Sequence, residues 1–342
     1  MKAVVVEGKG VIKICDDVPA PVIGPYDALV RIETCGFCNG TDTRIINGEM
    51  SFEQGLQPFP TVLGHEAAGV VVEIGSKVRN IKPGGKYIGV HGAETDGSRY
   101  SSTHGHMAEY GYIRDWPAAI ADGIEPPPST RLNISRLPED FDMVDASVLL
   151  PLCECLSAVR NFGIGPETDV LVYGAGPMGL AMMHYMKILG AKSVTCVDSV
   201  PRRLELAERV AGADRTINYL TGDVDAELGG MLFDRAVDAV GLSSVVSQAS
   251  LHLKPFGVVC SLGVLRKDDN LVNLSALKNN TSVHMLNFPF KEYDVLDENL
   301  EYIKQGLINP KDYYSHVLPM DQVDEALRLV YAKQTIKVIL KI

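Results

Sequence analysis

The chain has 342 residues, of which 46% are hydrophobic and 22% are charged, a balance typical of folded globular proteins. Its formal net charge of −11 argues against nucleic acids and anionic membranes as partners, because both require a basic surface. The uncharged stretch at residues 170–186 is too short to span a membrane, and the N-terminal residues lack the apolar run of a signal peptide. The odd number of cysteines, 7, does not suggest a secreted disulfide framework, so we expect a cytoplasmic protein.

The first part of the chain, to about residue 150, is rich in short β-segments separated by turns. Several segments alternate apolar and polar residues, as half-buried strands do. The predicted strands cover residues 1–6, 11–15, 28–34, 70–75 and 87–90. This part of the chain therefore predicts a small β-barrel or a partly open β-domain.

From residue 141 the pattern changes to helix, over residues 141–162, and then to alternating strands and helices. The apolar strand segments cover residues 170–173, 194–197, 215–217, 233–240 and 257–262. Repeated βα units of this size predict a parallel, doubly wound sheet. After about residue 288 we expect two further helices, near residues 298–306 and 321–333, and a closing strand at 336–342.

A glycine turn follows the first strand of the second part. Gly174 permits a tight turn, Gly176 lets the backbone approach a pyrophosphate, and Gly179 lets the following helix pack closely on the strand. The free N–H groups and the dipole of that helix favour a bound anion. Such a turn alone is often an ordinary loop, but here strand, helix and a later acidic residue all accompany it.

The acidic residue is Asp198, at the end of the next strand and roughly 20 residues after the turn, which is the spacing of a ribose-binding carboxylate. A 2′-phosphate would meet like charge there, so we expect NAD rather than NADP. Arg202 and Arg203 are the alternative, because they can receive a 2′-phosphate, flank the adenine or simply face solvent. The other predicted cofactor contacts are Pro177, Met178, Arg203, Val240 and Gly263.

Two short stretches of the first part carry candidate metal ligands. One is Cys38, spaced C-x-x-C with Cys35, and the other is the pair His65 and Glu66 after Gly64. Thiolate, imidazole and carboxylate are all ligands that zinc accepts, and a catalytic zinc site leaves one position open. Taken alone, His65 beside Glu66 is more often a surface pair.

With these motifs in hand, the chain resembles the zinc-dependent alcohol and polyol branch of the medium-chain dehydrogenase/reductase superfamily, which includes sorbitol-, threonine- and glucose-dehydrogenase-like enzymes. The resemblance covers nearly the whole chain and rests on the Cys38 stretch, residues 64–71, residues 105–110, the Gly174 turn, residues 233–241 and residues 337–340. It implies a GroES-like catalytic domain at residues 1–152, a Rossmann NAD-binding domain at 153–287, and a return to the catalytic domain at 288–342. It also implies a homodimer or homotetramer, paired through the edge strand of the nucleotide domain.

Residue by residue, the resemblance implies that Cys38 and His65 are zinc ligands and that Glu66 is the acid that joins or leaves the metal. It implies that Thr41 passes on the substrate proton. Two departures concern that proton: Asn39 and Gly40 lengthen the usual spacing between Cys38 and Thr41, and Arg44 stands where a relay histidine is common.

The position of the third zinc ligand departs further from the family's pattern, because Leu150 stands where this branch has a glutamate before Pro-Leu. Cys153 and Glu154 follow within about one helical turn of that position, and we expect Glu154 to replace the missing ligand. Residues 87–110 contain no cysteine, so the family's second, structural zinc is not expected.

The function that follows is NAD-dependent, zinc-assisted oxidation of a secondary alcohol of a polyol, cyclitol or sugar. Polar residues near the expected cleft suit a hydroxyl-rich substrate: Asn39, Arg44, His91, Glu94 and His106. One alternative is a zinc-free reductase of quinones or activated alkenes. Another is a non-catalytic dinucleotide sensor.

Overall fold

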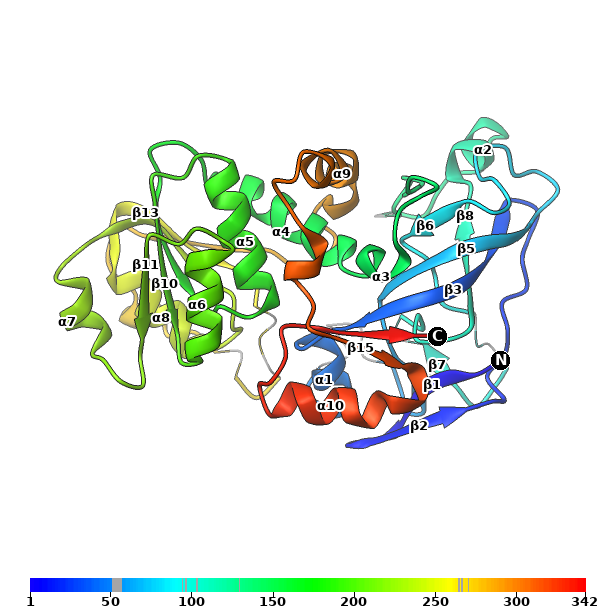
Figure 1. The fold of residues 1–342 in the computed structure, drawn as a ribbon, viewed down its shortest axis with the longest axis horizontal. Helices are drawn as coiled ribbons and strands as arrows, with labels where there is room; N and C mark the ends of the chain where they lie inside the picture. The colour runs from blue at the N-terminus through cyan, green and yellow to red at the C-terminus, as the bar shows by residue number, and fades with distance from the viewer. Residues whose placement is uncertain are drawn as a thin grey trace. The chain divides into compact units, whose positions relative to one another are not determined.

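The structure is a computed structural model that describes residues 1–50, 57–93, 95, 97–102, 104–128, 130–263, 265, 267–269 and 271–342. The chain forms two compact units (Figure 1). The first unit contains Met1–Leu150 and Tyr314–Ile342, and the second contains Pro151–Tyr313. The chain thus leaves the first unit near the predicted boundary but returns at Tyr314, later than the predicted residue 288.

The late return has a local cause in the packing of α9 (Leu296–Lys304). The Asn299 amide of this helix is buried and donates to the Cys153 sulfur at 3.4 Å, and the Tyr185 hydroxyl donates to Asn299. The Ser157 hydroxyl donates to the Phe290 carbonyl at 2.8 Å. Residues 290–304 are therefore bonded to elements of the second unit.

The first unit, where the sequence predicts a small β-barrel or a partly open β-domain, is built from two sheets. One sheet has the order β15-β16-β3-β5-β6, with β8 also paired to β3, and the other has the order β2-β1-β4-β7. The strands are β1 (Ala3–Gly8), β2 (Val11–Cys15), β3 (Asp27–Phe37), β4 (Thr61–Val62), β5 (Glu66–Ile74), β6 (Lys86–Ile88), β7 (Ser101–Ser102), β8 (Tyr110–Arg114), β15 (His316–Pro319) and β16 (Val338–Lys341). The helices are α1 (Thr41–Ile46), α2 (Trp116–Ala121), α3 (Met143–Ala146) and α10 (Val323–Tyr331).

Strand β3 is the centre of this unit, because β5, β8 and β16 all pair with it. Its inward side chains, among them Val30 and Ile32, are buried in the main core. At one end of β3, Gly36 is paired with Glu66 on β5, and Phe37 is paired with Val338 on β16. This register gathers the end of β3, the start of β5 and the start of β16 at one place.

The second unit is a six-stranded parallel sheet in the order β11-β10-β9-β12-β13-β14. Its strands are β9 (Asp169–Tyr173), β10 (Ser193–Asp198), β11 (Arg215–Asn218), β12 (Phe233–Asp238), β13 (Leu253–Ser261) and β14 (Ser282–Met285). Its helices are α4 (Leu149–Asn161), which begins at the boundary between the units, α5 (Pro177–Ile188), α6 (Pro201–Arg209), α7 (Val224–Leu228), α8 (Ser243–Leu251) and α9. The chain builds outward from β9 in one direction and then resumes at β12 on its other side, which creates the switch point where such sheets bind ligands.

The single helix predicted at residues 141–162 is two helices, α3 and α4. Asp142 caps the start of α3 by accepting from the Val144 and Asp145 N–H groups. The Ser147 N–H then bonds to the Val144 carbonyl, a tight closing turn that ends α3 before α4 begins. The apolar period continues across this break, which is why the pattern predicts one helix.

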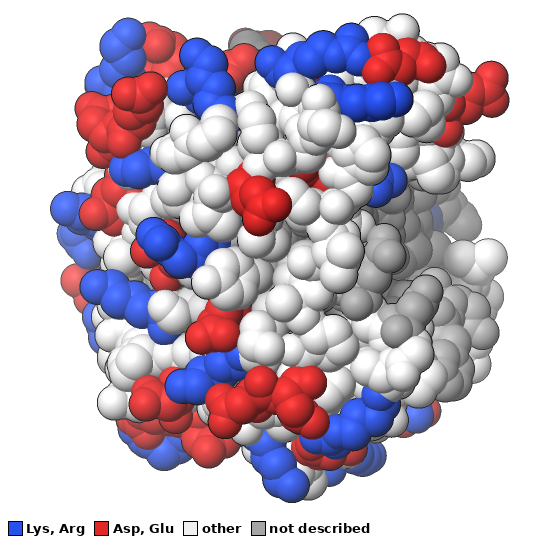
Figure 2. All heavy atoms as spheres, turned by 90° about the vertical axis from the view of Figure 1, so that its right-hand side faces the viewer, with Lys and Arg blue, Asp and Glu red and all other residues white. Residues whose placement is uncertain are grey.

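No described helix is both long and apolar enough to cross a bilayer. On the described part of the face shown in Figure 2, basic and acidic side chains lie interspersed, and acidic side chains also lie near the middle of the view. The described part of that face shows no broad basic patch.

Candidate metal and cofactor sites

Cys38, His65 and Glu66 form a group of possible metal ligands in the first unit. One donor atom from each residue can be chosen so that all lie within 4.8 Å of one another. Cys38 directly follows β3, while His65 precedes β5 and Glu66 opens it, so the β3–β5 register brings them together. Sulfur, nitrogen and oxygen donors at this spacing fit zinc, which leaves a position for a substrate when three protein ligands hold it.

Asp42 supports two members of the group. Its side chain is completely buried, and Oδ2 accepts from the Cys38 N–H at 2.8 Å. Its Oδ1 lies 3.2 Å from Nδ1 of His65, an ion-pair distance at which the two atoms are not aligned for a hydrogen bond. A carboxylate behind a ligand imidazole orients the ring and leaves Nε2 to face a metal.

The protonation of His65 follows from the same neighbours. Burial alone lowers its pKa, but Asp42 and the Cys38 sulfur favour the charged ring, so the pKa of His65 is raised well above its usual value. A bound metal must displace that proton, because only neutral imidazole is a ligand.

Glu66 has a further partner, Lys337, the residue directly before β16. Lys337 Nζ donates to both carboxylate oxygens of Glu66, and the two side chains are 3% and 2% exposed. Burial opposes the charge on the ammonium, but Glu66 and Cys38 raise the pKa of Lys337 overall. A Cβ at Gly36 would lie 2.2 Å from Oε2 of Glu66, so only glycine leaves room for this carboxylate.

The structure also places the other residues near Cys38 that were considered from the sequence. Cys35 is fully buried, burial raises the pKa of its thiol, and the group of possible ligands among the described residues contains Cys38 but not Cys35. The Asn39 amide donates to the Ile336 carbonyl at 2.9 Å, which ties the Cys38 turn to the residue before Lys337. Thr41 begins α1 and Arg44 is buried within it; the relay role of Thr41 stays a prediction.

Glu154 lies on α4, in the second unit, and its role as a replacement ligand stays a prediction. Leu150, at the family's ligand position, is buried and offers no donor atom. His91 and His106 both line a pocket in the first unit, and burial lowers the pKa of both imidazoles. The remaining polar candidate, Glu94, lies outside the described residues.

The glycine turn in the second unit fits a dinucleotide diphosphate. Gly174 has φ +100°, a conformation that favours glycine, and a Cβ at Gly179 would lie 1.9 Å from the Gly174 carbonyl oxygen. Gly176 caps α5, and no atom lies within 4 Å of the position of its missing Cβ. The N-terminus of α5, with Pro177 and Met178 in its first turn, is therefore open to an anion.

Asp198 ends β10 beside this turn. Its Oδ2 accepts from the Ala175 N–H at 2.7 Å, and its Oδ1 accepts from the Ser199 and Val200 N–H groups at 2.7 and 2.8 Å. A carboxylate has about four acceptor positions, so this side chain keeps capacity for a ribose hydroxyl. Arg203 lies in the first turn of α6, and its Nε is buried without a hydrogen-bond partner.

Val240 and Gly263 complete the predicted cofactor set. The Val240 side chain is 42% exposed and lies next to Gly174, where a Cβ would approach its Cγ2 to 2.9 Å. A Cβ at Gly263 would lie 2.1 Å from the Gly241 nitrogen, so the loops after β12 and β13 pack closely through glycine. Both residues follow strand ends near the switch point.

Comparison with known proteins agrees with a metal site in the first unit and a dinucleotide site in the second. Residues 24–119 match the family described as alcohol dehydrogenase GroES-like domain, and residues 177–301 match the family described as zinc-binding dehydrogenase. An alcohol dehydrogenase of Cupriavidus necator is 30% identical over 84% of this chain and 82% of its own length. An L-idonate 5-dehydrogenase of Vitis vinifera is 27% identical over 89% of this chain and 84% of its own. The alcohol dehydrogenase TADH of Thermus sp. ATN1 superposes with a TM-score of 0.78 at 25% identity, covering 100% of this chain and 99% of that one.

The chain therefore belongs to the zinc-binding alcohol dehydrogenases of the medium-chain dehydrogenase/reductase superfamily, and it is an oxidoreductase that acts on CH–OH groups. The predicted family and fold class are confirmed.

Two residues of the metal region were not singled out from the sequence. Asp42 lies four positions after Cys38, and an acid so close to a candidate ligand was a usable signal for a supporting carboxylate. Lys337 appeared only as part of the closing motif at residues 337–340, and nothing local pointed to its partner Glu66, which is 271 positions away. The pairing of β16 and β5 with the same strand, β3, brings the two together.

Proposed function

We propose that this protein is an NAD-dependent, zinc-assisted dehydrogenase that oxidises a secondary alcohol of a polyol, cyclitol or sugar to the ketone, reversibly. The observation that carries the proposal is the group formed by Cys38, His65 and Glu66, whose donor atoms come within 4.8 Å of one another. The names of relatives, which include an alcohol and an L-idonate dehydrogenase, support the same reaction class.

One catalytic zinc would be held by the Cys38 thiolate and the His65 imidazole, with Glu66 and Glu154 as the further candidate ligands. When bound, the ion would supply Lewis-acid polarisation of the substrate hydroxyl. Asp42 would hold Cys38 and His65 in position, and Lys337 would hold the Glu66 side chain near them through its hydrogen bonds. Thr41 is proposed to carry the substrate proton onward.

The cofactor preference rests on Asp198. A carboxylate at the end of β10 can accept hydrogen bonds from the adenosine ribose of NAD, whereas the 2′-phosphate of NADP would meet a like charge there. The open N-terminus of α5 supplies N–H groups for the diphosphate. Arg203 is proposed to flank the adenosine end.

The test combines metal analysis with a substrate screen. Protein purified without chelators should hold about one zinc per chain, and it should oxidise members of a polyol and inositol panel faster with NAD than with NADP. Chelation should abolish this activity, and zinc should restore it. Cys38→Ser should lose zinc and activity while it still binds NADH.

Three outcomes would reject the proposal. Absence of zinc together with activity on enones that survives chelation would instead identify a zinc-free reductase. Dinucleotide binding without turnover of any alcohol would identify a sensor. A preference for NADP would remove the role given to Asp198.

A further inference from the structure

An open pocket of about 670 Å³ lies in the first unit. Three imidazoles and several hydroxyl groups line it, among them His91, His104, His106, Ser101, Ser102 and Tyr112. The ring centroid of His104 is 5.3 Å from that of His65, so one wall of the pocket contacts a candidate metal ligand. The pocket therefore opens beside the group formed by Cys38, His65 and Glu66.

The wall that carries His91 is held by main-chain bonds. The N–H groups of His91 and Tyr112 each donate to the other's carbonyl, at 2.7 and 2.9 Å, and their rings lie 5.3 Å apart. On another side, the His106 N–H donates to the Gly64 carbonyl at 3.0 Å, and β7 is paired with β4. Main-chain bonds of this kind hold the lining side chains in one arrangement, as selective binding requires.

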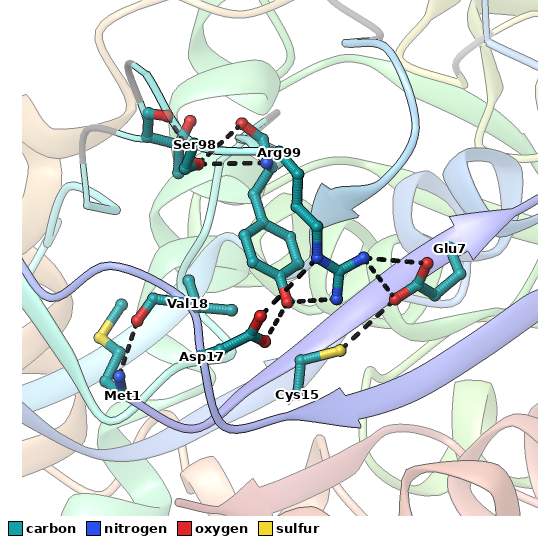
Figure 3. A network of polar contacts seen from close by, with 9 residues as sticks. Met1, Glu7, Cys15, Asp17, Val18, Ser98 and Arg99 are labelled. Atoms are coloured by element: carbon teal, nitrogen blue, oxygen red, sulfur yellow. Dashed lines mark hydrogen bonds and ion pairs between the residues drawn. The ribbon is translucent and has the colours of Figure 1, made fainter.

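The described lining residues include no lysine, arginine, aspartate or glutamate. Arg99 stands between two lining residues, Ser98 and Tyr100, but its guanidinium is engaged elsewhere (Figure 3). It donates to Glu7 at 3.1 Å, lies 3.7 Å from Asp17, and stacks 4.3 Å from the Tyr100 ring centroid. Two carboxylates thus already neutralise this cation.

The His91 ring adds no positive charge near neutral pH. Burial lowers the pKa of His91 to about 4, with Arg131 and Arg114 also disfavouring the charged ring and Asp27 favouring it. A neutral imidazole offers one N–H donor and one nitrogen acceptor. Hydroxyl groups of a ligand can use both, since each hydroxyl donates once and accepts.

We infer that this pocket selects uncharged, polyhydroxylated substrates over carboxylate-bearing ones, and that His91 is a specificity-determining residue. The inference rests on the proposed function and narrows its substrate class. When a hexitol enters the pocket, its hydroxyl groups would exchange their hydrogen bonds to water for hydrogen bonds to the hydroxyls and imidazoles of the lining, which have a similar capacity. An aldonate would lose the hydration of its carboxylate, and no described residue that lines the pocket offers a positive charge in return, which is costly.

The experiment compares a hexitol with the aldonate of the same configuration at the oxidised carbon, using the zinc-loaded enzyme and NAD. The kcat/KM for the hexitol should exceed that for the aldonate by at least about 100-fold, because a polar site rejects a ligand it cannot pair. Equal use of the two compounds, or a preference for the aldonate, would overturn the inference.

Variants then test His91. His91→Phe keeps a ring against Tyr112 but removes both hydrogen-bonding nitrogens, so KM for the hexitol should rise about 10-fold while kcat stays within about threefold. His91→Gln, which restores a donor and an acceptor, should recover most of the loss. The matched control is His316→Phe on β15, which removes an imidazole that does not line the pocket and should leave KM unchanged. An unchanged KM in His91→Phe would reject the role of His91.

Failure of the proposed function can be distinguished from failure of this inference about the pocket. If no alcohol is turned over, that function falls, and calorimetry with the same hexitol and aldonate still measures the selectivity of the pocket. Binding of the aldonate as tight as that of the hexitol, or binding of neither, would then reject the inference as well.

Discussion

The ammonium of Lys337 lies 2.6 Å from Oε1 and 2.5 Å from Oε2 of Glu66, in a place that solvent barely reaches. Neither charge is tolerated alone in such surroundings, because desolvation of an unpaired ion is costly. The pair therefore couples the last strand of the first unit to a candidate metal ligand. Glu66 thus has a fixed cationic partner in the same structure in which one of its oxygens lies within 4.8 Å of donor atoms of Cys38 and His65.

The first prediction removes the cation. Lys337→Met should destabilise the chain by about 3–5 kcal/mol, because Glu66 would remain buried without a partner. Urea unfolding followed by far-UV circular dichroism measures the loss. The double variant Lys337→Met with Glu66→Gln should regain much of it, since no unpaired charge is left. A single variant as stable as the parent would show that Glu66 is neutral or that solvent reaches it.

Asp42 provides a second prediction, on metal affinity. Asp42→Asn keeps an oxygen for the Cys38 N–H but removes the negative charge beside Nδ1 of His65. Zinc affinity should fall by about 10–100-fold, the usual effect of losing a carboxylate behind a ligand histidine. Competition with a chromophoric chelator measures it. The matched control is Asp122→Asn. Asp122 caps the C-terminus of α2 and forms an ion pair with Arg79 that is more exposed than Asp42, so this variant should bind zinc like the parent.

The donor residues could be found from the sequence because their chemistry is local. Cys38, His65 and Glu66 stand in short motifs, and cysteine, histidine and glutamate are all residue types that bind zinc. Their arrangement depends on strand register, which no local pattern shows. For the same reason the contact of Lys337 with Glu66 was missed, although Lys337 lies within the closing strand predicted at residues 336–342, of which the structure forms Val338–Lys341.

The prediction of the fold succeeded where the apolar period ran over many residues, and it failed where the elements were short. The glycine turn and the strands around it follow the predicted order. By contrast, β4 and β7 have two residues each, too few for any period to be visible. Helix α9 is amphipathic, and amphipathicity predicts a buried face without saying which unit covers it. That is why residue 288 was taken as the point of return.

A third prediction concerns cofactor choice. Asp198→Ala should lower the ratio of kcat/KM for NAD to that for NADP by at least about 10-fold, because a bond from a ribose hydroxyl to a charged group contributes about 1.5–3 kcal/mol. Steady-state kinetics with both cofactors on one alcohol measures the ratio. The side chain also accepts three main-chain bonds, so Asp198→Asn, which removes the charge but keeps an acceptor, is the necessary companion. If neither variant shifts the ratio, Asp198 is structural.

The last prediction concerns acid stability of the second unit. Asp169 accepts from Lys254 Nζ at 2.8 Å, and this bond, helped by Ser193 and Lys192, lowers the pKa of Asp169 from 3.8 to about 2. A carboxyl whose pKa is lowered by folding stabilises the native state above its unfolded pKa, and this contribution disappears as the pH falls through the folded pKa. The stability gap between the parent and Lys254→Met should therefore be constant above about pH 5 and shrink between pH 5 and pH 2. Urea unfolding at several pH values measures the gap. A gap that stays constant down to pH 2 would mean that Lys254 contributes through its packed methylene chain rather than through its charge.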